Sequence, residues 1–215
     1  MADVTDKIHD FFSKYPKHTY PKGQILVFAN EDPEHIFYIT KGRVRQYDVS
    51  YRGDEIVLNV FKQGAFFPMS WAINRTPNRY FAKTEVETEL HVVPPDDAVA
   101  FLRDNPDVTY DLLSRVYRGT DGLLGRVVHL MSGTARSRLI YELIIECRRI
   151  GEKQTAGKCL LDLTEVDLAA RSGLSRETVS REMGRMKKEG WVDVVGKKIR
   201  VLDCQQLKQA LGTAI

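Results

Sequence analysis

The chain has little cysteine, and this shortage excludes several kinds of site. Its three cysteines, Cys147, Cys159 and Cys204, form no closely spaced pair in 215 residues. They are too few for a four-cysteine iron–sulfur cluster or zinc site, so neither group is expected. Two interpretations stay open. Cys147 and Cys159 could form a redox pair across a helix end, or all three could be buried, unreactive thiols.

Long apolar runs and catalytic signatures are also missing. No run approaches the roughly 18 apolar residues of a membrane-spanning helix. The start MADVTDKIHDFF has acidic residues where a signal peptide would be basic. We therefore expect a cytoplasmic protein with no membrane partner. His18, His35 and His91 are scattered, and no paired acid and base or nucleophile motif occurs, so no metal, no catalytic residue and no enzyme is expected.

The charge that is present is unevenly distributed. Residues 1–133 hold 16 Lys and Arg against 18 Asp and Glu, whereas residues 134–215 hold 16 against 11. The net charge of +3 therefore comes from the C-terminal part. A modest basic excess in one part favours a specific nucleic-acid reader there, and the helix-turn-helix pattern described next makes double-stranded DNA the expected partner. The 43% hydrophobic content leaves room for a separate sensor in the rest of the chain.

The stretch 164–202 has the pattern of a winged helix-turn-helix. Two short helices are predicted on either side of the sequence Ser172-Gly173-Leu174, with Thr164 and Ser175 as their N-caps. Gly173 suits the positive φ angle of the tight turn. The residues expected in the shared core are Leu168, Ala169, Leu174, Val179 and Met183. Trp191 to Val195 and Lys198 to Val201 are expected to pair as a hairpin around Gly196-Lys197, which forms the wing.

The second of these helices carries the residues expected to read DNA bases. Glu177, Ser180 and Arg181 share one face, and Arg176 flanks it. An arginine can bond both major-groove acceptors of guanine, and a glutamate can accept from the cytosine amino group. The alternative is a solvated helix face with an internal Glu177–Arg181 ion pair. Contacts to the DNA backbone are expected from Thr164, Ser175, Thr178, Lys197, Lys198 and Arg200, although the wing cations could equally be ordinary basic surface.

Residues 20–93 form a series of short segments rich in β-branched and aromatic residues. The segments are ILVF at 25–28, IFYI at 36–39, RVRQY at 43–47 and EIVLNVF at 55–61, separated by Gly23, Gly42, Gly53 and Gly64. This pattern predicts an antiparallel barrel or jelly roll.

A long helix is predicted after Pro106. Val116, Thr120, Leu123, Val127 and Leu130 follow the 4-3-4-3 spacing of a two-helix coiled coil, so we expect a homodimer if this seam is exposed. The alternative is that the stripe packs only on its own roll. Three glycines, Gly119, Gly122 and Gly125, either allow a close helix approach or loosen the helix. Ser132-Gly133-Thr134 interrupts the helical pattern and is the expected hinge, and the polar run at 152–158 is expected to be a loop.

At the string SRETV followed by Arg181, the chain resembles the CRP/FNR superfamily of transcription regulators. The alternation around YITKGRVRQY is similar to the β-roll of the cyclic-nucleotide-binding fold, with Gly42 at a tight turn. The resemblance implies that Arg176, Glu177 and Arg181 read a TGTGA-type half-site. It also implies a homodimer and RNA polymerase as a partner.

The roll departs from the nucleotide-binding pattern of that family. Where relatives have a segment resembling GDFFGE, this chain has Gly64-Ala65-Phe66-Phe67-Pro68-Met69. Proline has no N–H, and methionine replaces the glutamate, which argues against binding cyclic AMP in the family's manner. The effector stays unidentified. The candidate pocket residues are Phe67, Met69, Trp71, Arg75, Arg79, Tyr80 and Phe81, which could instead be roll core and solvated arginines.

Together these features predict an α+β fold in three segments. Residues 1–107 form the β-roll sensor domain, 108–133 the dimerisation helix and hinge, and 134–215 the winged helix-turn-helix. The predicted function is a homodimeric, sequence-specific regulator whose roll senses a small-molecule or redox signal and repositions the recognition helices. The alternative is a ligand-independent DNA-binding regulator in which the roll is only a structural dimerisation module.

Overall fold

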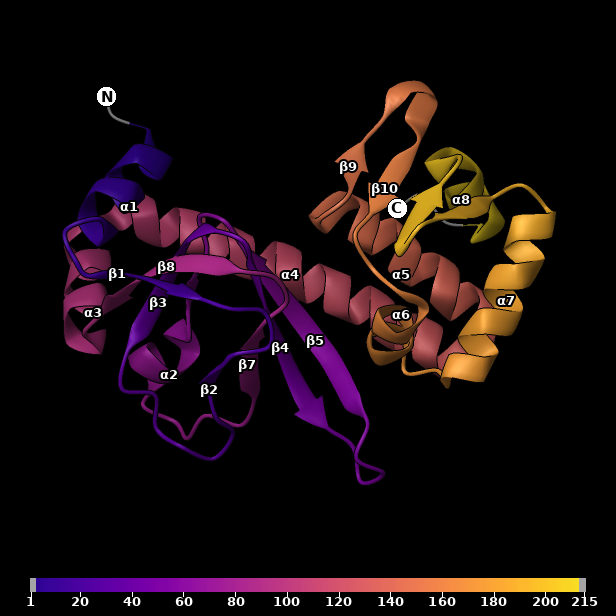
Figure 1. Ribbon diagram of the computed structural model, residues 1–215. Coiled ribbons are helices and arrows are strands. Elements are labelled where there is room, and N and C mark those ends of the chain that lie inside the picture. The colour runs from indigo at the N-terminus through magenta and orange to yellow at the C-terminus, as the bar shows by residue number, and fades with distance from the viewer. Residues whose placement is uncertain (1–2, 213–215) are drawn as a thin grey trace. The chain divides into compact units, whose positions relative to one another are not determined.

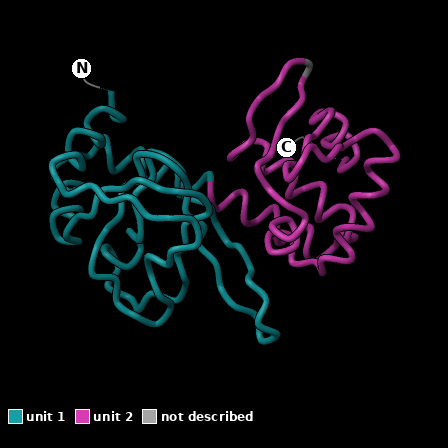
Figure 2. The backbone as a smooth tube through the Cα atoms, viewed as in Figure 1, with its two compact units in different colours: residues 1–118 teal, residues 119–215 magenta. Residues whose placement is uncertain are grey.

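The computed structural model describes residues 3–212, apart from the side chain of Ala156. The chain consists of two compact units, and the boundary between them lies between Arg118 and Gly119 (Figure 2). This boundary lies inside the long helix α4 (Pro106–Ser132), which therefore contributes to both units. The three-segment division at 107 and 133 stays a prediction. Within the described residues, no helix is both long and apolar enough to cross a membrane.

The N-terminal unit is an antiparallel β-roll flanked by helices (Figure 1). One sheet has the order β1-β8-β3-β6, and the other has the order β2-β7-β4-β5. The elements are α1 (Val4–Phe12), β1 (Lys17–Tyr20), β2 (Ile25–Val27), β3 (Ile36–Lys41), β4 (Arg43–Val49), β5 (Glu55–Lys62), β6 (Phe66–Phe67), α2 (Met69–Asn74), β7 (Phe81–Thr84), β8 (Thr88–Val93) and α3 (Pro95–Asp104), followed by the start of α4. The strand segments expected from the sequence are confirmed, and Gly42 takes φ +91° at the turn from β3 to β4.

Two apolar cores hold the roll, one on each side of the first sheet. Phe37 and Ile39 of β3 face the second sheet and pack with Val44 and Ala82. Their neighbours Ile36 and Tyr38 point the other way, into a core shared with α1, α2 and α3. Since alternate residues of a strand face opposite sides, a strand buried on both faces needs an unbroken apolar run. This explains why the sequence at 36–39 shows no polar alternation.

The C-terminal unit is built from helices and a small antiparallel sheet of order β11-β12-β10-β9. Its elements after α4 are α5 (Ala135–Arg149), β9 (Glu152–Lys153), a 3-10 turn (Thr155–Gly157), β10 (Cys159–Leu161), α6 (Glu165–Ser172), α7 (Arg176–Lys188), β11 (Val192–Val195), β12 (Lys198–Val201) and α8 (Cys204–Ala210). The expected interruption at 132–134 is confirmed, because α4 ends at Ser132 and the Thr134 hydroxyl caps α5 by accepting from the N–H of Ser137. The stretch 152–158 contains a strand and a 3-10 turn, so the expectation of a simple loop there was wrong.

Helices α4 and α5 approach each other closely at a glycine. A Cβ atom at Gly125 would lie 2.1 Å from the hydroxyl oxygen of Tyr141, whereas Gly119 and Gly122 face open space. The Tyr141 hydroxyl instead donates to the carbonyl of Gly122 at 2.9 Å. Of the two interpretations of the three glycines, a close approach between helices is therefore confirmed at Gly125, where the neighbouring helix is α5.

Charged groups are buried where α4, α5 and α6 meet. Arg126 of α4 forms a two-pronged bond with Glu142 of α5, with N–O distances of 2.5 and 3.0 Å. Glu146 of α5 is fully buried beside Arg171 of α6, and the Nε–Oε2 distance is 3.6 Å. Arg149 approaches the other oxygen of Glu146 at 3.8 Å. Pairing of this kind is what allows charges to be buried, because an unpaired charge inside a protein is strongly disfavoured.

Candidate nucleic-acid interface

The two helices of the helix-turn-helix begin at well-formed caps. The Thr164 hydroxyl accepts from the backbone N–H of Asp167, and the Asp167 carboxylate accepts in return from the N–H of Thr164. The Ser175 hydroxyl caps α7 by accepting from the N–H of Thr178 at 3.2 Å. Gly173 ends α6 with φ +64°. The local signals in the sequence therefore predicted both helix starts and the turn between them.

A shared core fixes the orientation of α7. Leu168, Val179 and Met186 are fully buried, Met183 is nearly so, and Leu174 packs against them. Burial of this face forces the opposite face of α7 into solvent, since the helix has a period of 3.6 residues. The core residues expected from the sequence are confirmed.

The four predicted base-reading residues lie together on that exposed face. Arg176, Glu177, Ser180 and Arg181 are all exposed and line one surface depression of about 480 Å³. The guanidinium of Arg181 lies 3.9 Å from Glu182, and among the described ion pairs it is not matched with Glu177. The face therefore presents two guanidinium groups, one carboxylate and one hydroxyl to solvent.

The carboxylate of Glu177 is held in its charged form. Its own backbone N–H and the Ser175 side chain lower the pKa of Glu177, and the charge of Arg176 acts in the same direction. A group with a lowered pKa stays ionised until the pH falls below its ordinary range. At neutral pH this side chain is thus purely a hydrogen-bond acceptor, as contact with a cytosine amino group requires.

The wing presents cations beside this helix. Ile199 and Val201 of β12 are buried, so Lys198 and Arg200 alternate onto the outer face of the strand. Lys197 is exposed and follows Gly196, which takes φ +62° in the turn. The remaining predicted backbone contacts, Thr164, Ser175 and Thr178, lie at the N-terminal ends of α6 and α7. Helix N-termini favour phosphate groups because unpaired N–H donors point outward there.

The predicted seam of α4 is an exposed stripe in the single chain. Val116, Leu123, Val127 and Leu130 are exposed by 55%, 41%, 46% and 40%, and Thr120 is exposed as well. Leu113, at 48%, extends the same spacing by three residues and was missed in the sequence. A continuous apolar stripe of this kind marks an interaction surface.

The predicted effector residues are spread over several environments. Phe67 stacks on Phe61 inside the roll, with ring centroids 4.6 Å apart, whereas Met69 is buried in the core with α1 and α3. Trp71 lies on α2 and donates to Asp32 at 3.2 Å, while Arg75 pairs with Asp96. Phe81 stacks on Tyr47 at 5.2 Å. Arg79 and Tyr80 are exposed in the loop before β7.

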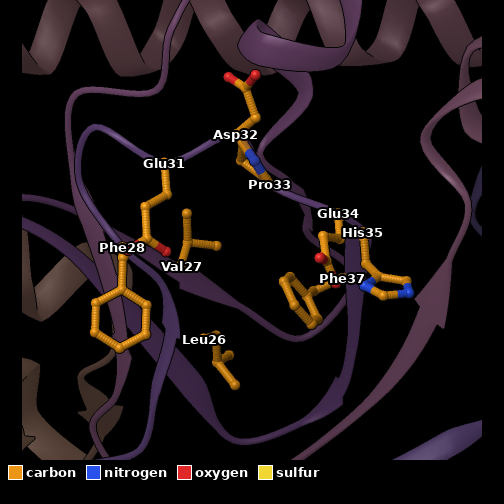
Figure 3. Close-up of a pocket in the computed structure, with 9 residues that line it drawn as sticks. All are labelled: Leu26, Val27, Phe28, Glu31, Asp32, Pro33, Glu34, His35 and Phe37. Atoms are coloured by element: carbon orange, nitrogen blue, oxygen red, sulfur yellow. The ribbon is translucent and has the colours of Figure 1, made fainter.

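A pocket in the roll lies elsewhere (Figure 3). Its volume is about 320 Å³, and its lining contains none of the seven predicted residues. The labelled side chains include three carboxylates, Glu31, Asp32 and Glu34, together with His35 and an apolar wall of Leu26, Val27, Phe28, Pro33 and Phe37. A negatively charged lining repels an anionic effector. Within the described residues, no cluster of three His, Cys, Asp or Glu side chains could hold a metal ion.

Comparison with known proteins assigns a family to both units. Residues 17–105 match the cyclic nucleotide-binding domain family, and residues 137–210 match the Crp-like helix-turn-helix domain family. The chain belongs to the CRP/FNR superfamily. Relatives in it are transcription regulators and not enzymes, so the capped helices described above are the DNA-binding helix-turn-helix of a CRP/FNR transcription regulator.

Individual CRP/FNR proteins are distant from this chain in sequence. The cyclic AMP receptor protein of Thermus thermophilus is 27% identical over 94% of this chain and 91% of its own length. The global nitrogen regulator of Nostoc sp. is 25% identical over 85% of this chain and 83% of its own length.

Solved CRP/FNR structures share the fold. A CRP/FNR-family transcriptional regulator from Thermus thermophilus is 22% identical, with a TM-score of 0.74 over 92% of this chain and 99% of its own. The c-di-GMP-responsive global regulator of Xanthomonas campestris is 17% identical, with a TM-score of 0.78 over 91% of this chain and 98% of its own.

Proposed function

We propose that this regulator binds DNA sequence-specifically as a homodimer and reads a near-palindromic operator with TGTGA-type half-sites. The observation that carries the proposal is the exposed face of α7, where Arg176, Glu177, Ser180 and Arg181 lie together on a helix fixed by two caps and a buried core. Two arginines and an ionised glutamate match the groups that guanine and cytosine present in the major groove. The proposed half-site TGTGA contains two such pairs.

The other proposed contacts position the protein on DNA. Lys197, Lys198 and Arg200 of the wing, with Thr164, Ser175 and Thr178 at the helix N-termini, face the sugar–phosphate backbone in this proposal. Contacts of this kind add affinity and fix orientation but carry no direct sequence information.

The homodimer is proposed to form through the stripe on α4. A 4-3-4-3 apolar spacing is self-complementary, so a second copy of the same helix provides a matching surface. Two recognition helices related by a two-fold axis then meet two half-sites of a palindrome. A signal received by the roll is proposed to act through α4 and the break at 132–134, which changes the spacing of the recognition helices. A contact with RNA polymerase stays a prediction from the family.

A second candidate function leaves out the signal. Pro68 has no N–H to donate, and Met69 packs in the apolar core, so the two groups that would bind a cyclic nucleotide are missing. In this candidate the roll is a structural dimerisation module. A thermal-shift screen with cyclic nucleotides, haem, 2-oxo acids and nucleotides separates the two, because a ligand that binds the folded protein raises its unfolding temperature, and the second candidate predicts no shift with any of them.

Replacement of Glu177 tests the assignment of base readout. In the Glu177→Ala variant, the preference for one base pair over the others at a single position of the half-site is expected to fall by about 5- to 150-fold. The reason is that the acceptor for the cytosine amino group is removed. Binding-site selection on a randomised half-site measures this preference. The matched control is Lys197→Ala, which is expected to weaken binding to every sequence alike and to reduce the salt dependence. An unchanged base preference in Glu177→Ala would remove this glutamate from the readout.

A further inference from the structure

Three cysteines that are distant in the sequence meet in the C-terminal unit. Cys147 lies in the last turns of α5, Cys159 begins β10, and Cys204 begins α8. All three cysteines line one pocket of this unit. All three are free thiols. We call this group the thiol cluster.

The backbone is shaped around the thiol cluster. The Cys159 sulfur lies 3.9 Å from the carbonyl oxygen of Cys147. A Cβ atom at Gly151 would lie 2.2 Å from the same sulfur and 2.5 Å from that carbonyl oxygen. Only a residue without a side chain therefore leaves room for Cys159 in this position, directly after the end of α5.

A pocket connects the thiol cluster to solvent. Its volume is about 270 Å³, and all three cysteines contribute to its lining. The same lining contains four cationic side chains, Arg148, Lys153, Lys158 and Lys208, and no carboxylate. Cations beside a thiol stabilise the thiolate, which is the form that reacts with oxidants.

The three thiols differ in acidity. A hydrogen bond with Cys147 lowers the pKa of Cys159 against the effect of burial, and a second bond with Cys204 acts in the same direction. The hydrogen bond with Cys159, together with burial, raises the pKa of Cys147. Burial raises the pKa of Cys204. The cluster thus holds one thiol whose pKa is lowered and two thiols whose pKa is raised.

This arrangement fits thiol oxidation better than metal binding. Within residues 3–212, no group of three or more His, Cys, Asp and Glu has a geometry that could hold a metal ion, and this includes the thiol cluster. Cys159 lies beside Cys147, because its sulfur is 3.9 Å from the Cys147 carbonyl oxygen and packs against Gly151, which follows the end of the same helix α5. Two neighbouring thiols that line one pocket, one of them with a lowered pKa, are the reactants for disulfide formation.

We propose that the thiol cluster is a peroxide-oxidisable site whose product is a disulfide between Cys147 and Cys159. The Cys159 thiolate attacks one oxygen of hydrogen peroxide, the O–O bond breaks, and the leaving hydroxide takes a proton to become water. Cys159 is then a sulfenic acid. The Cys147 sulfur attacks it, the S–S bond forms, the S–O bond breaks, and a second water leaves with the Cys147 proton. Two thiols are oxidised, and one peroxide is reduced to two waters.

The consequence is a covalent link inside the DNA-binding unit. The disulfide joins α5 to β10, and β10 leads to Thr164, the N-cap of α6. An oxidant signal would therefore enter the helix-turn-helix directly, without a ligand in the roll. Cys204 stays a thiol in the product.

Peptide mapping of the full-length protein tests this proposal. The reduced protein is treated with one equivalent of hydrogen peroxide at neutral pH, denatured, alkylated with N-ethylmaleimide and analysed by mass spectrometry. The expected product is about 2 Da lighter before alkylation, carries the label only on Cys204, and yields a cross-linked peptide pair containing Cys147 and Cys159. Labels on all three cysteines, a bond that includes Cys204, or a cross-link between chains would overturn the proposal.

Single substitutions separate the roles of the three thiols. Cys204→Ser, the matched control, is expected to form the same disulfide. Cys147→Ser is expected to stop at a sulfenic acid on Cys159, which dimedone traps. If a variant does not fold, the wild-type protein in guanidinium chloride serves instead, because loss of the fold is expected to abolish the preference for the Cys147–Cys159 pair. A preference that persists in the denatured chain would contradict the assignment to the folded site.

Discussion

A full-length variant that carries Leu123→Glu and Val127→Glu is expected to be a monomer and to lose on the order of 100-fold in affinity for a palindromic operator. Both side chains belong to the exposed apolar stripe of α4. Four carboxylates brought together across a two-fold axis repel each other and lose hydration, so the paired helices separate. Each recognition helix then binds its half-site alone, and the gain from binding two linked half-sites is lost.

Sedimentation and gel shift on the same sample measure this effect. The matched control is Val128→Glu, which adds a carboxylate at an exposed position of α4 outside the 4-3-4-3 stripe. It is expected to stay dimeric. Affinity for an isolated half-site should be the same in all three proteins, because the variants leave α7 intact. A Leu123→Glu, Val127→Glu protein that still sediments as a dimer would place the dimer interface elsewhere.

Replacement of Glu146 is expected to give the largest loss of stability in the C-terminal unit. In the Glu146→Ala variant, the guanidinium of Arg171 stays buried without its carboxylate, and Arg149 loses the same partner. Removing one member of a buried ion pair typically costs about 3–5 kcal/mol, because the remaining charge has no compensation. The loss is measured as the change in the free energy of unfolding in urea.

The control for this prediction is Glu152→Ala, which removes an exposed carboxylate from β9. Its effect is expected to stay within about 0.5 kcal/mol. Replacing Glu146 and Arg171 together by apolar residues should recover part of the loss, since the guanidinium of Arg171 is then no longer buried without its carboxylate. If Glu146→Ala were as stable as the wild-type protein, the ion pair would contribute nothing to the fold.

The helix-turn-helix could be predicted from the sequence because its determinants are local. The caps at Thr164 and Ser175, the turn at Gly173 and the apolar spacing along α7 all lie within a few residues of the feature that they determine. Each is a matter of backbone geometry or helical period. The base-reading face follows from the same period, so its four residues were found together.

The inner surface of the roll was not predictable in the same way. No helix was predicted after β6, yet Met69–Asn74 form the helix α2, and this places Met69 in a core with α1 and α3. The secondary structure of such a segment depends on its packing against elements that are distant in the sequence. Local residue patterns do not reveal that packing. The acidic pocket likewise depends on how the segment before β3 folds back on β2.

Convergence of side chains from distant elements could be predicted only in part. The sequence left Cys147 and Cys159 open as a pair across a helix end, but it did not indicate that Cys204, which follows the wing, lines the same pocket. Glu146 has the appearance of an ordinary helix-surface charge until Arg171 is brought against it by the packing of α6 on α5. These pairs exist only in the folded C-terminal unit.

A gel shift of the full-length protein on two DNA duplexes tests the central claim most directly. One duplex carries two inverted TGTGA-type half-sites, and the other carries the same bases in scrambled order. At a fixed salt concentration of about 0.15 M, the protein is expected to bind the palindrome at least about 1,000-fold more tightly, as specific readers do. Equal affinity for the two duplexes would contradict sequence-specific reading of this half-site by Arg176, Glu177 and Arg181.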